Sequence, residues 1–365
     1  MKSMRKLNKA GMILSMVIGM IIAACMSPAA GPEVVESDEA AAPAMQETQS
    51  TLSIVQERGH LVCIGNAQLP GFGFLDSEGN FSGFDVDYCR AIAAAIFGDA
   101  DALEVRPASA RERFTILSSG EGDVIIRNTT WTMSRDTDLG MNFGPTTFYD
   151  GQGLMVRKES GVSTLQDLQG ASVCVVTGTT TELNLADQFA AAGVSYEAVV
   201  FEDFDQSFNA YDEGRCDAVT TDKSSLVSRQ TTLTAPADHV IINVTLSKEP
   251  LGPAVRHGDD QWFDLVNWVV YATMIAEEAG ITSQNVDSFM DSNDPNIRKL
   301  LGLEGDFCAK VGIANSGCFA DVIKQLGNYA EIYDRNLGPD TVFDLPRGLN
   351  SLYTDGGILY APPIR

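Results

Sequence analysis

The sequence of 365 residues predicts an α/β fold with two lobes, each a sheet flanked by helices, joined by a two-strand hinge. From residue 52 onward, short β-like runs alternate with stretches whose apolar residues have helical spacing, which indicates parallel sheets covered by helices. The order strand, helix, strand, helix, strand occurs once before residue 145 and again between about 171 and 221. This repetition predicts two lobes of similar construction.

The individual elements follow from local patterns. The expected strands are LVCIG (61–65), LEVRPAS (103–109), DVIIR (123–127), ASVCVV (171–176), EAVVF (197–201) and DAVTT (217–221). The expected helices are DVDYCRAIAAAIFG, RERFTILSSG, TTELNLADQFAAAG and DFDQSFNAYDEG, several of which are closed by Gly. The extended segments TTFYDGQGLMVRKE and VIINVTLSKEPLGPAVR (240–256) predict the outward and return strands of the hinge. The later helices, beginning with WFDLVNWVVYATMIAEEAG, are expected to rejoin the first lobe.

The first 25 residues have the features of an export signal. The basic segment MKSMRKLNK precedes the apolar run AGMILSMVIGMIIAA, which is typical of a secretory signal peptide. The run ends in Ile22, Ala23, Ala24 and Cys25, which resembles a bacterial lipobox. The resemblance implies that Cys25 receives lipid and anchors the exported chain at the cell surface or in the periplasm. The alternative is an ordinary signal peptide cleaved near Ala24, with a free cysteine.

Composition limits the function classes. The chain has 25 basic and 49 acidic residues, a formal net charge of −24, which disfavours binding to nucleic acid or to anionic lipid headgroups. The three histidines, His60, His239 and His257, have no metal-ligand spacing, so we expect neither a metal nor a cofactor. No second apolar stretch is long enough to span a bilayer.

Seven cysteines occur, so six remain if Cys25 carries lipid, and an even number in an exported chain favours disulfides. Spacing within the lobes suggests that the bonds are local, although sequence alone does not determine the connectivity. The expected pairs are Cys63 with Cys89, Cys174 with Cys216, and Cys308 with Cys318.

The same patterns suggest domain boundaries. We expect a leader with lipobox (1–25), a disordered linker (26–50), the first part of lobe 1 (51–148), hinge and lobe 2 (149–249), the return of lobe 1 (250–304) and a C-terminal extension (305–365). The linker is rich in Ala, Pro, Glu and Ser and has no apolar periodicity, so it cannot bury enough surface to fold by itself.

Five motifs in order resemble those of the polar amino-acid-binding proteins of ABC importers. They are SGFDVDYCRAIAAAIFGD, GDVIIRNTTWTMSRDTDLGMNFGPTTFYDGQG, TGTTTELNLAD, GRCDAVTTD and DHVIINVTLSKEPLGPAVR. The C-terminal segments VIKQLGNYAEIYDRNLGP and RGLNSLYTDGGILYAPP resemble those of general L-amino-acid binders. The resemblance implies a type II periplasmic-binding-protein fold. It also implies a monomer that closes on an L-amino acid and delivers it to ABC transporter permease subunits.

The resemblance also implies a ligand clamp between the lobes. Arg135 matches the arginine that holds the ligand α-carboxylate, because a guanidinium binds a carboxylate bidentately. Asp222 matches the acid that pairs with the α-ammonium. Each residue has a structural alternative: Arg135 could be a surface residue paired with Asp136 or Asp138, and Asp222 could cap the helix that follows it.

Polar residues that follow strands complete the predicted site. By resemblance, the backbone at Asn128 and the hydroxyl of Thr130 accept from the ammonium, while the Thr130 N–H helps to hold the carboxylate. Thr180, with Thr179 beside it, matches the carboxylate contact at a helix N-terminus, where backbone N–H groups and the helix dipole favour an anion. The alternatives are ordinary turn formers at Asn128 and Thr130 and a simple Thr cap of the helix.

The side-chain pocket is the least defined part of the predicted site. Leu69 and Phe72 lie in the loop that matches the region covering the ligand side chain, but the usual aromatic residue before proline is missing there. Arg127 and Trp131 could also face the pocket, although Phe72 and Trp131 could equally be core residues.

Two other functions fit the same fold. An enzyme such as a dehydratase acting on a ring-bearing amino acid would need an acid with a raised pKa beside its substrate. The sequence offers Asp222 but no pattern typical of a Ser or Cys nucleophile with its base. A sensor module that presents a bound amino acid to a membrane receptor is the third hypothesis.

Overall fold

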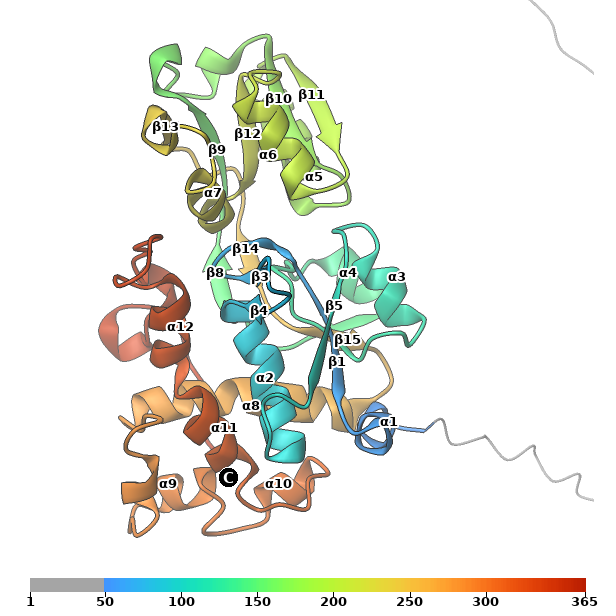
Figure 1. The fold of residues 1–365 in the computed structure, drawn as a ribbon, viewed down its shortest axis with the longest axis vertical. Helices are drawn as coiled ribbons and strands as arrows, with labels where there is room; N and C mark the ends of the chain where they lie inside the picture. The colour runs from blue at the N-terminus through green and yellow to red at the C-terminus, as the bar shows by residue number, and fades with distance from the viewer. Residues whose placement is uncertain (1–48) are drawn as a thin grey trace, which may run out of the picture. The chain divides into compact units, whose positions relative to one another are not determined.

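The computed structural model of the chain describes residues 49–365 (Figure 1). The predicted signal peptide (1–25), the lipid attachment at Cys25 and most of the predicted linker lie outside the described residues. Among residues 49–365, no helix is both long enough and apolar enough to cross a membrane. The described part contains two five-stranded sheets, each covered by helices, together with two smaller sheets.

The first five-stranded sheet, which defines lobe 1, has the strand order β5-β1-β6-β15-β7. Its strands are β1 (Leu61–Gly65), β5 (Leu103–Pro107), β6 (Val124–Ile125), β7 (Met141–Phe143) and β15 (Ala254–Arg256). Strand β1 pairs in parallel with β5 and β6, whereas β15 pairs antiparallel with β6 and β7. Because β15 follows all strands of the second sheet along the chain, the chain returns to lobe 1 after building lobe 2.

The second five-stranded sheet, which defines lobe 2, repeats this plan in the order β11-β10-β12-β9-β13. Its strands are β9 (Gln152–Arg157), β10 (Ala171–Val176), β11 (Tyr196–Phe201), β12 (Ala218–Asp222) and β13 (His239–Ile241). A central strand again has two parallel neighbours, and the next strand, β9, runs antiparallel. The repetition predicted from the order of elements is therefore confirmed.

Two strands join the lobes: β8 (Phe148–Asp150) pairs antiparallel with β14 (Glu249–Leu251). In Figure 1 they lie where the chain passes between the two large sheets. The predicted two-lobed α/β fold with a two-strand hinge is confirmed. Strand β6 is shorter than the predicted 123–127, since it spans Val124–Ile125. Shortly after its end, Asn128 adopts a positive φ of 29°.

The remaining elements surround these sheets. A small antiparallel sheet in lobe 1 consists of β2 (Gln68–Leu69), β3 (Gly73–Leu75) and β4 (Phe81–Ser82). The α-helices are α1 (Thr51–Arg58), α2 (Phe84–Phe97), α3 (Arg113–Ser118), α4 (Met133–Thr137), α5 (Thr180–Ala192), α6 (Phe204–Asp212), α7 (Lys223–Gln230), α8 (Asp260–Glu278), α9 (Pro295–Leu300), α10 (Phe307–Lys310), α11 (Cys318–Leu326) and α12 (Tyr329–Leu337).

The core of lobe 1 is built on helices α2 and α8, beside which α11 and α12 lie (Figure 1). Helix α2 is buried along almost its whole length. Its run of small Ala residues allows the neighbouring helices to pack closely against it. Phe84, at its start, contacts the rings of Tyr329 and Tyr333 on α12 edge-on. The predicted C-terminal extension is thus an integral part of the lobe 1 core.

The C-terminal extension also supports the first hinge strand. The side chain of Asn350 accepts from the N–H of Tyr149 at 2.7 Å and donates to its carbonyl at 3.2 Å. The Tyr329 hydroxyl donates to the carbonyl of Thr147 at 2.7 Å. These backbone contacts fix one hinge strand to lobe 1, so the strand leaves the lobe at a defined position.

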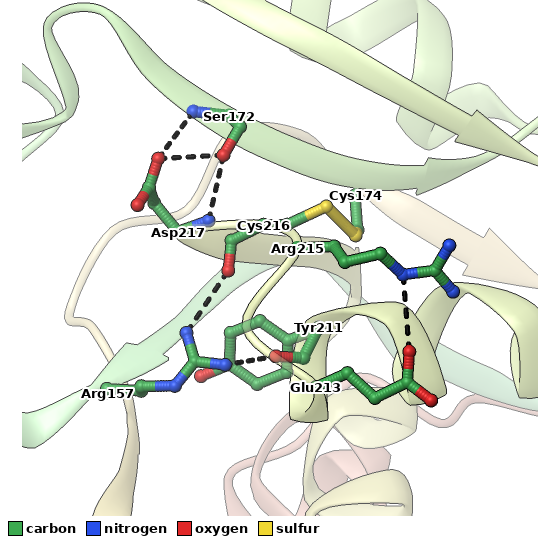
Figure 2. Close-up of a disulfide and its surroundings, with 8 residues drawn as sticks. All are labelled: Arg157, Ser172, Cys174, Tyr211, Glu213, Arg215, Cys216 and Asp217. Carbon is green, nitrogen blue, oxygen red and sulfur yellow. Dashed lines mark hydrogen bonds and ion pairs between the residues drawn. A yellow bond between two sulfur atoms is a disulfide. The ribbon is translucent and has the colours of Figure 1, made fainter.

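Three disulfides join Cys63 to Cys89, Cys174 to Cys216 and Cys308 to Cys318, which are the pairs expected from the sequence. Figure 2 shows the second of them, which links β10 to the segment before β12.

Hydrogen bonds reinforce the second disulfide on both sides (Figure 2). Ser172 and Asp217 exchange hydrogen bonds through backbone and side chain, while Arg157 donates to the carbonyl of Cys216 and packs over the Tyr211 ring. This disulfide therefore stabilises the strand that ends at Asp222.

Gly83, the residue before α2, allows a close approach that no other residue permits. It has a φ of 125°, and a Cβ there would lie 2.2 Å from the carbonyl oxygen of Phe72. Gly83→Ala is therefore expected to destabilise the protein by about 2–4 kcal/mol in urea unfolding, because strain adds to a backbone clash. Gly79→Ala is the control, since its φ is 89° but nothing lies within 4 Å of its Cβ position, and it should cost only about 1 kcal/mol. Equal losses would contradict the clash.

Candidate functional site

A small cavity lies between the lobes at the carboxyl ends of strands from both sheets, the edge where open α/β sheets present ligand sites. Lobe 1 contributes the segment after β6, and lobe 2 contributes the end of β12 and the start of α5. The cavity is lined by Arg113, Arg127, Asn128, Thr130, Thr179, Thr180, Thr181, Phe204, Thr221 and Asp222. Five of the eight residues expected for the ligand site are among them.

Polar contacts cross the cavity from one lobe to the other. The Asn128 side-chain N–H₂ donates to the Asp222 carboxylate at 3.4 Å, and the hydroxyl oxygens of Thr130 and Thr180 are 3.4 Å apart. Asp222 occupies the N-cap position of α7, but its side chain makes no capping hydrogen bond. Its carboxylate is thus directed to the cavity. Burial, with the charges of Asp150 and Glu249, raises the pKa of Asp222 well above its usual value.

Arg135 lies beside the cavity and is buried, with 7% of its surface exposed. Its Nη1 donates to the carbonyl of Thr130 at 2.8 Å, and the guanidinium lies 5.1 Å above the Phe114 ring centroid. Within residues 49–365 Arg135 forms no ion pair with Asp136. The Asp136 carboxylate is instead directed to His257, with Oδ1 3.7 Å from its Nε2. Burial lowers the pKa of Arg135 to about 10, which leaves the side chain cationic at neutral pH. The surface-arginine alternative is therefore excluded by its burial.

Arg113, which the sequence reasoning missed, brings another guanidinium to the cavity. It is buried, and its Nη1 donates to the carbonyl of Arg127 at 3.2 Å and to the Thr129 hydroxyl at 3.1 Å. Its Nε has no hydrogen-bond partner among residues 49–365. Arg113 begins a helix that follows strand β5, and this place after a strand is the signal that could have identified it. Arg127, named as a possible pocket residue, lines the cavity.

The start of α5 combines capping with exposure to the cavity. Thr179 is the N-cap: its hydroxyl accepts from the N–H of Glu182 at 3.1 Å and donates to the carbonyl of Val176 at 2.7 Å. Thr180, the first helical residue, donates its hydroxyl to Glu249 at 2.8 Å. The capping interpretation of the TGTTTE motif holds for Thr179, and the same helix end forms one wall of the cavity.

Two buried acids close to the cavity were also missed. Glu249, in hinge strand β14, accepts hydrogen bonds from Thr130 and Thr180. Asp85, in the first turn of α2, accepts the N–H of Asn128 at 2.8 Å. Burial raises the pKa of Asp85 to about 7, against the opposing effects of this hydrogen bond and of Arg127. Asp85 belongs to the FDVD motif, but the residues around it in the sequence do not indicate that its side chain contacts the loop at Asn128.

Leu69 and Phe72 do not line this cavity. Both are fully buried in the lobe 1 core, where the Phe72 ring packs edge-on against Phe84 and Phe148 at centroid distances of 6.2 and 5.2 Å. The close contact between Phe72 and Gly83 holds this loop against α2, so its aromatic side chain turns inward. Trp131 is 45% exposed and stacks on Phe143.

The site is rich in charge but not in metal ligands. Within the described part of the chain, no group of three or more His, Cys, Asp or Glu side chains is arranged to hold a metal ion. The cavity instead combines guanidinium groups, the Asp222 carboxylate and hydroxyls, a set suited to an organic zwitterion.

Residues 61–280 match the family described as bacterial extracellular solute-binding proteins, family 3. The chain belongs to this family. The general L-amino acid-binding periplasmic protein AapJ of Rhizobium johnstonii is 52% identical over 318 residues, which cover 87% of this chain and 93% of that protein. The glutamate/glutamine/aspartate/asparagine-binding protein BztA of Rhodobacter capsulatus is 48% identical over 317 residues, 87% of this chain and 94% of that protein.

Solved structures agree with this family 3 assignment. An ABC transporter periplasmic binding protein from Brucella ovis, solved with glutathione bound, superposes with a TM-score of 0.85 at 48% identity. The match covers 87% of this chain and all of that one, so it includes the C-terminal extension. The type II periplasmic-binding-protein fold implied by the sequence motifs is confirmed.

Asp85 is expected to make the stability of this family 3 protein depend on pH. Its pKa is about 7 in the folded state and near 3.8 when unfolded, so its stabilising contribution is complete below pH 4 and is lost as pH rises to 7. Asp85→Asn should remove this loss. The stability of the variant relative to the wild type should therefore rise by about 2 kcal/mol between pH 5 and pH 7 in urea unfolding.

Asp101→Asn is the control for this titration, since the Asp101 side chain is 88% exposed. Its stability relative to the wild type should stay constant over the same pH range. A constant difference for Asp85→Asn as well would contradict the titration of Asp85.

Proposed function

We propose that this chain is an extracytoplasmic substrate-binding protein that captures L-amino acids and delivers them to an ABC importer. The observation that carries the proposal is the cavity between the lobes, where Asp222 from lobe 2 faces buried guanidinium groups from lobe 1. An amino acid presents an ammonium and a carboxylate a few bonds apart, and burying both requires a partner of opposite charge for each.

The clamp assigns one end of the ligand to each partner. Asp222 pairs with the α-ammonium, and Asn128 and Thr130 add neutral acceptors beside it. Arg135 takes the α-carboxylate together with N–H groups at Thr130 and at the start of α5, where the helix dipole favours an anion. Arg113 and Thr179 complete the polar wall of the cavity. Both contacts of the clamp are to atoms that all amino acids share.

The names of the relatives support this ligand class. AapJ is called a general L-amino acid-binding protein, and BztA is named for glutamate, glutamine, aspartate and asparagine. The relative YhdW of Escherichia coli, 45% identical over 317 residues, is named a putative amino-acid ABC transporter-binding protein. We infer from these names that the partners of this chain are the permease subunits of such a transporter. We also propose that the chain is a monomer.

An enzymatic function on the same fold is the second candidate. A solved ancestral amino acid-binding protein, 27% identical and with a TM-score of 0.54, is described as a precursor of cyclohexadienyl dehydratase. The raised pKa of Asp222 is a property that a general acid would also need. In the proposed function, Asp222 instead pairs with the ligand ammonium. Mass spectrometry of ring-bearing amino acids after incubation separates the two functions, because a binding protein returns them unchanged.

We also propose that residues 1–25 direct export and that the mature chain is a lipoprotein anchored through Cys25. In this arrangement the predicted linker, residues 26–50, connects the anchor to the folded body, in the periplasm or at the cell surface. The support is the sequence alone: a basic start, an apolar run and the motif Ile22-Ala23-Ala24-Cys25.

The clamp predicts that Arg135→Ala and Asp222→Asn each weaken the binding of every amino-acid ligand. Loss of one partner of a buried charge pair costs about 2–5 kcal/mol, or about 30-fold to several thousand-fold in affinity. Relative specificity should change little. Calorimetric titration with small, large and charged amino acids measures both effects. Arg106→Ala, which removes an exposed ion pair with Glu121, is the control and should bind normally. Near-normal binding by both clamp variants would exclude this site.

The anchor predicts that Cys25→Ser releases the protein from membranes. Expressed in a bacterial host with labelled fatty acid, the wild type should carry label and sediment with membranes, because its modified cysteine holds acyl chains. The Cys25→Ser variant should be unlabelled and soluble after export. Met26→Ala, adjacent to the cysteine, should behave as the wild type. Label retained by Cys25→Ser would contradict the lipobox.

A further inference from the structure

One carboxylate in the hinge contacts both lobes. Glu249 is 1% exposed, and its Oε2 accepts from the hydroxyl of Thr130 at 2.5 Å and from that of Thr180 at 2.8 Å. Its Oε1 accepts from the Asn184 side chain at 2.8 Å and from the Ser247 hydroxyl. Thr130 belongs to lobe 1, Thr180 and Asn184 belong to α5 of lobe 2, and Ser247 belongs to the hinge. All four donors are neutral, so this carboxylate is satisfied without a cation in direct contact.

The two threonines lie between Glu249 and the cavity. Thr130 and Thr180 both line the cavity, whereas Glu249 does not. Glu249 therefore stands behind the threonine hydroxyls, not inside the space that a ligand would occupy. A ligand carboxylate has no need to displace it.

The chemistry of a carboxylate determines the direction of these hydrogen bonds. An ionised carboxylate only accepts, and a hydroxyl has a single hydrogen to donate. Thr130 and Thr180 both donate that hydrogen to Glu249, so only their oxygen lone pairs remain for the cavity. Asp222, which lines the same cavity, is also an acceptor. Thr130, Thr180 and Asp222 therefore present acceptor oxygens to a ligand in the cavity.

We propose that Glu249 is a positioning residue that makes Thr130 and Thr180 acceptors for a protonated amine of the ligand. The inference rests on the proposed amino-acid-binding function and adds a selectivity to it: the site rejects ligands that lack the cationic amine. It also refines one part of the clamp, because Thr180 can then meet a ligand carboxylate only through its backbone N–H. That N–H is in the first turn of α5 and has no acceptor within the helix.

The test is Glu249→Gln, which keeps the size of the side chain but adds N–H donors where the threonines need acceptors. L-Leucine and its α-hydroxy analogue, L-leucic acid, are the probes, because they differ only in the amine. In calorimetric titrations, the wild type should prefer leucine strongly. Glu249→Gln should lower the affinity for leucine about 10- to 100-fold, which is the effect of losing one hydrogen bond to a charged group. It should also reduce the ratio of the affinity for leucine to the affinity for leucic acid.

Two further variants separate positioning from general damage to the fold. Asn184 donates to Glu249 but does not line the cavity, and Asn184→Ala leaves both threonine contacts in place. This variant should therefore prefer leucine over leucic acid by the same factor as the wild type. In the background of Thr130→Val with Thr180→Val, Glu249→Gln should cause no further change in the preference, because no hydroxyl remains to be oriented. A merely structural role would lower stability in both backgrounds without changing the preference.

The outcomes separate the inference from the function on which it rests. A wild type that binds none of the common amino acids would refute the proposed function itself. A wild type that binds leucine, with an unchanged amine preference in Glu249→Gln, would overturn the role of Glu249 and leave the function intact.

Discussion

The need to bury charges between two lobes governs the organisation of this protein. Arg113, Arg127 and Arg135 of lobe 1 lie on or beside a cavity with Asp222 of lobe 2. Removing such groups from water is costly unless each finds an opposite charge or a set of hydrogen bonds. Arg127 lies near Asp85, and Arg135 near Glu249 and Asp222, so the balance depends on elements from both lobes and from the hinge. A zwitterion that enters the cavity meets partners of both signs that are already desolvated.

Charges from two lobes can meet only if the hinge holds the lobes in a defined position. The C-terminal extension and a disulfide of lobe 2 both contribute to this. Asn350 and Tyr329, from the C-terminal extension, bind the backbone of the first hinge segment. The Arg347–Glu277 ion pair, at 3.0 Å, links the extension to helix α8. In lobe 2, a disulfide joins Cys174 on β10 to Cys216, so the strand that ends at Asp222 is held to its neighbour. The extension and the disulfide therefore stabilise opposite sides of the same site.

Much of the fold could be predicted because it depends on local pattern. Strands 61–65 and 171–176 were predicted with the bounds that the structure has, since their apolar runs are buried on both faces of a sheet. Strand β6 is shorter than the run DVIIR predicts, and the positive φ of Asn128, which directly follows that run, has no signature in it. Phe72 was assigned to the pocket as one possibility. Its direction depends on packing against Phe84 of α2 and Phe148 of β8, contacts that form only when these elements come together.

By itself, the sequence determined the two-lobed α/β plan, the cysteines available for pairing, the polar residues that follow strands β6 and β10, and the acid that ends β12. These properties depend on periodicity, spacing and turn chemistry, which act over a few residues. Only the tertiary structure decided that Arg113 faces the same cavity, that Asp85 supports Asn128 and that Glu249 stands behind two threonines. Glu249 is separated from Thr130 by 119 residues, and hydrogen bonds over such separations exist only after both sheets and the hinge have formed. For that physical reason, the direction in which each hydroxyl donates could not be derived from the order of residues.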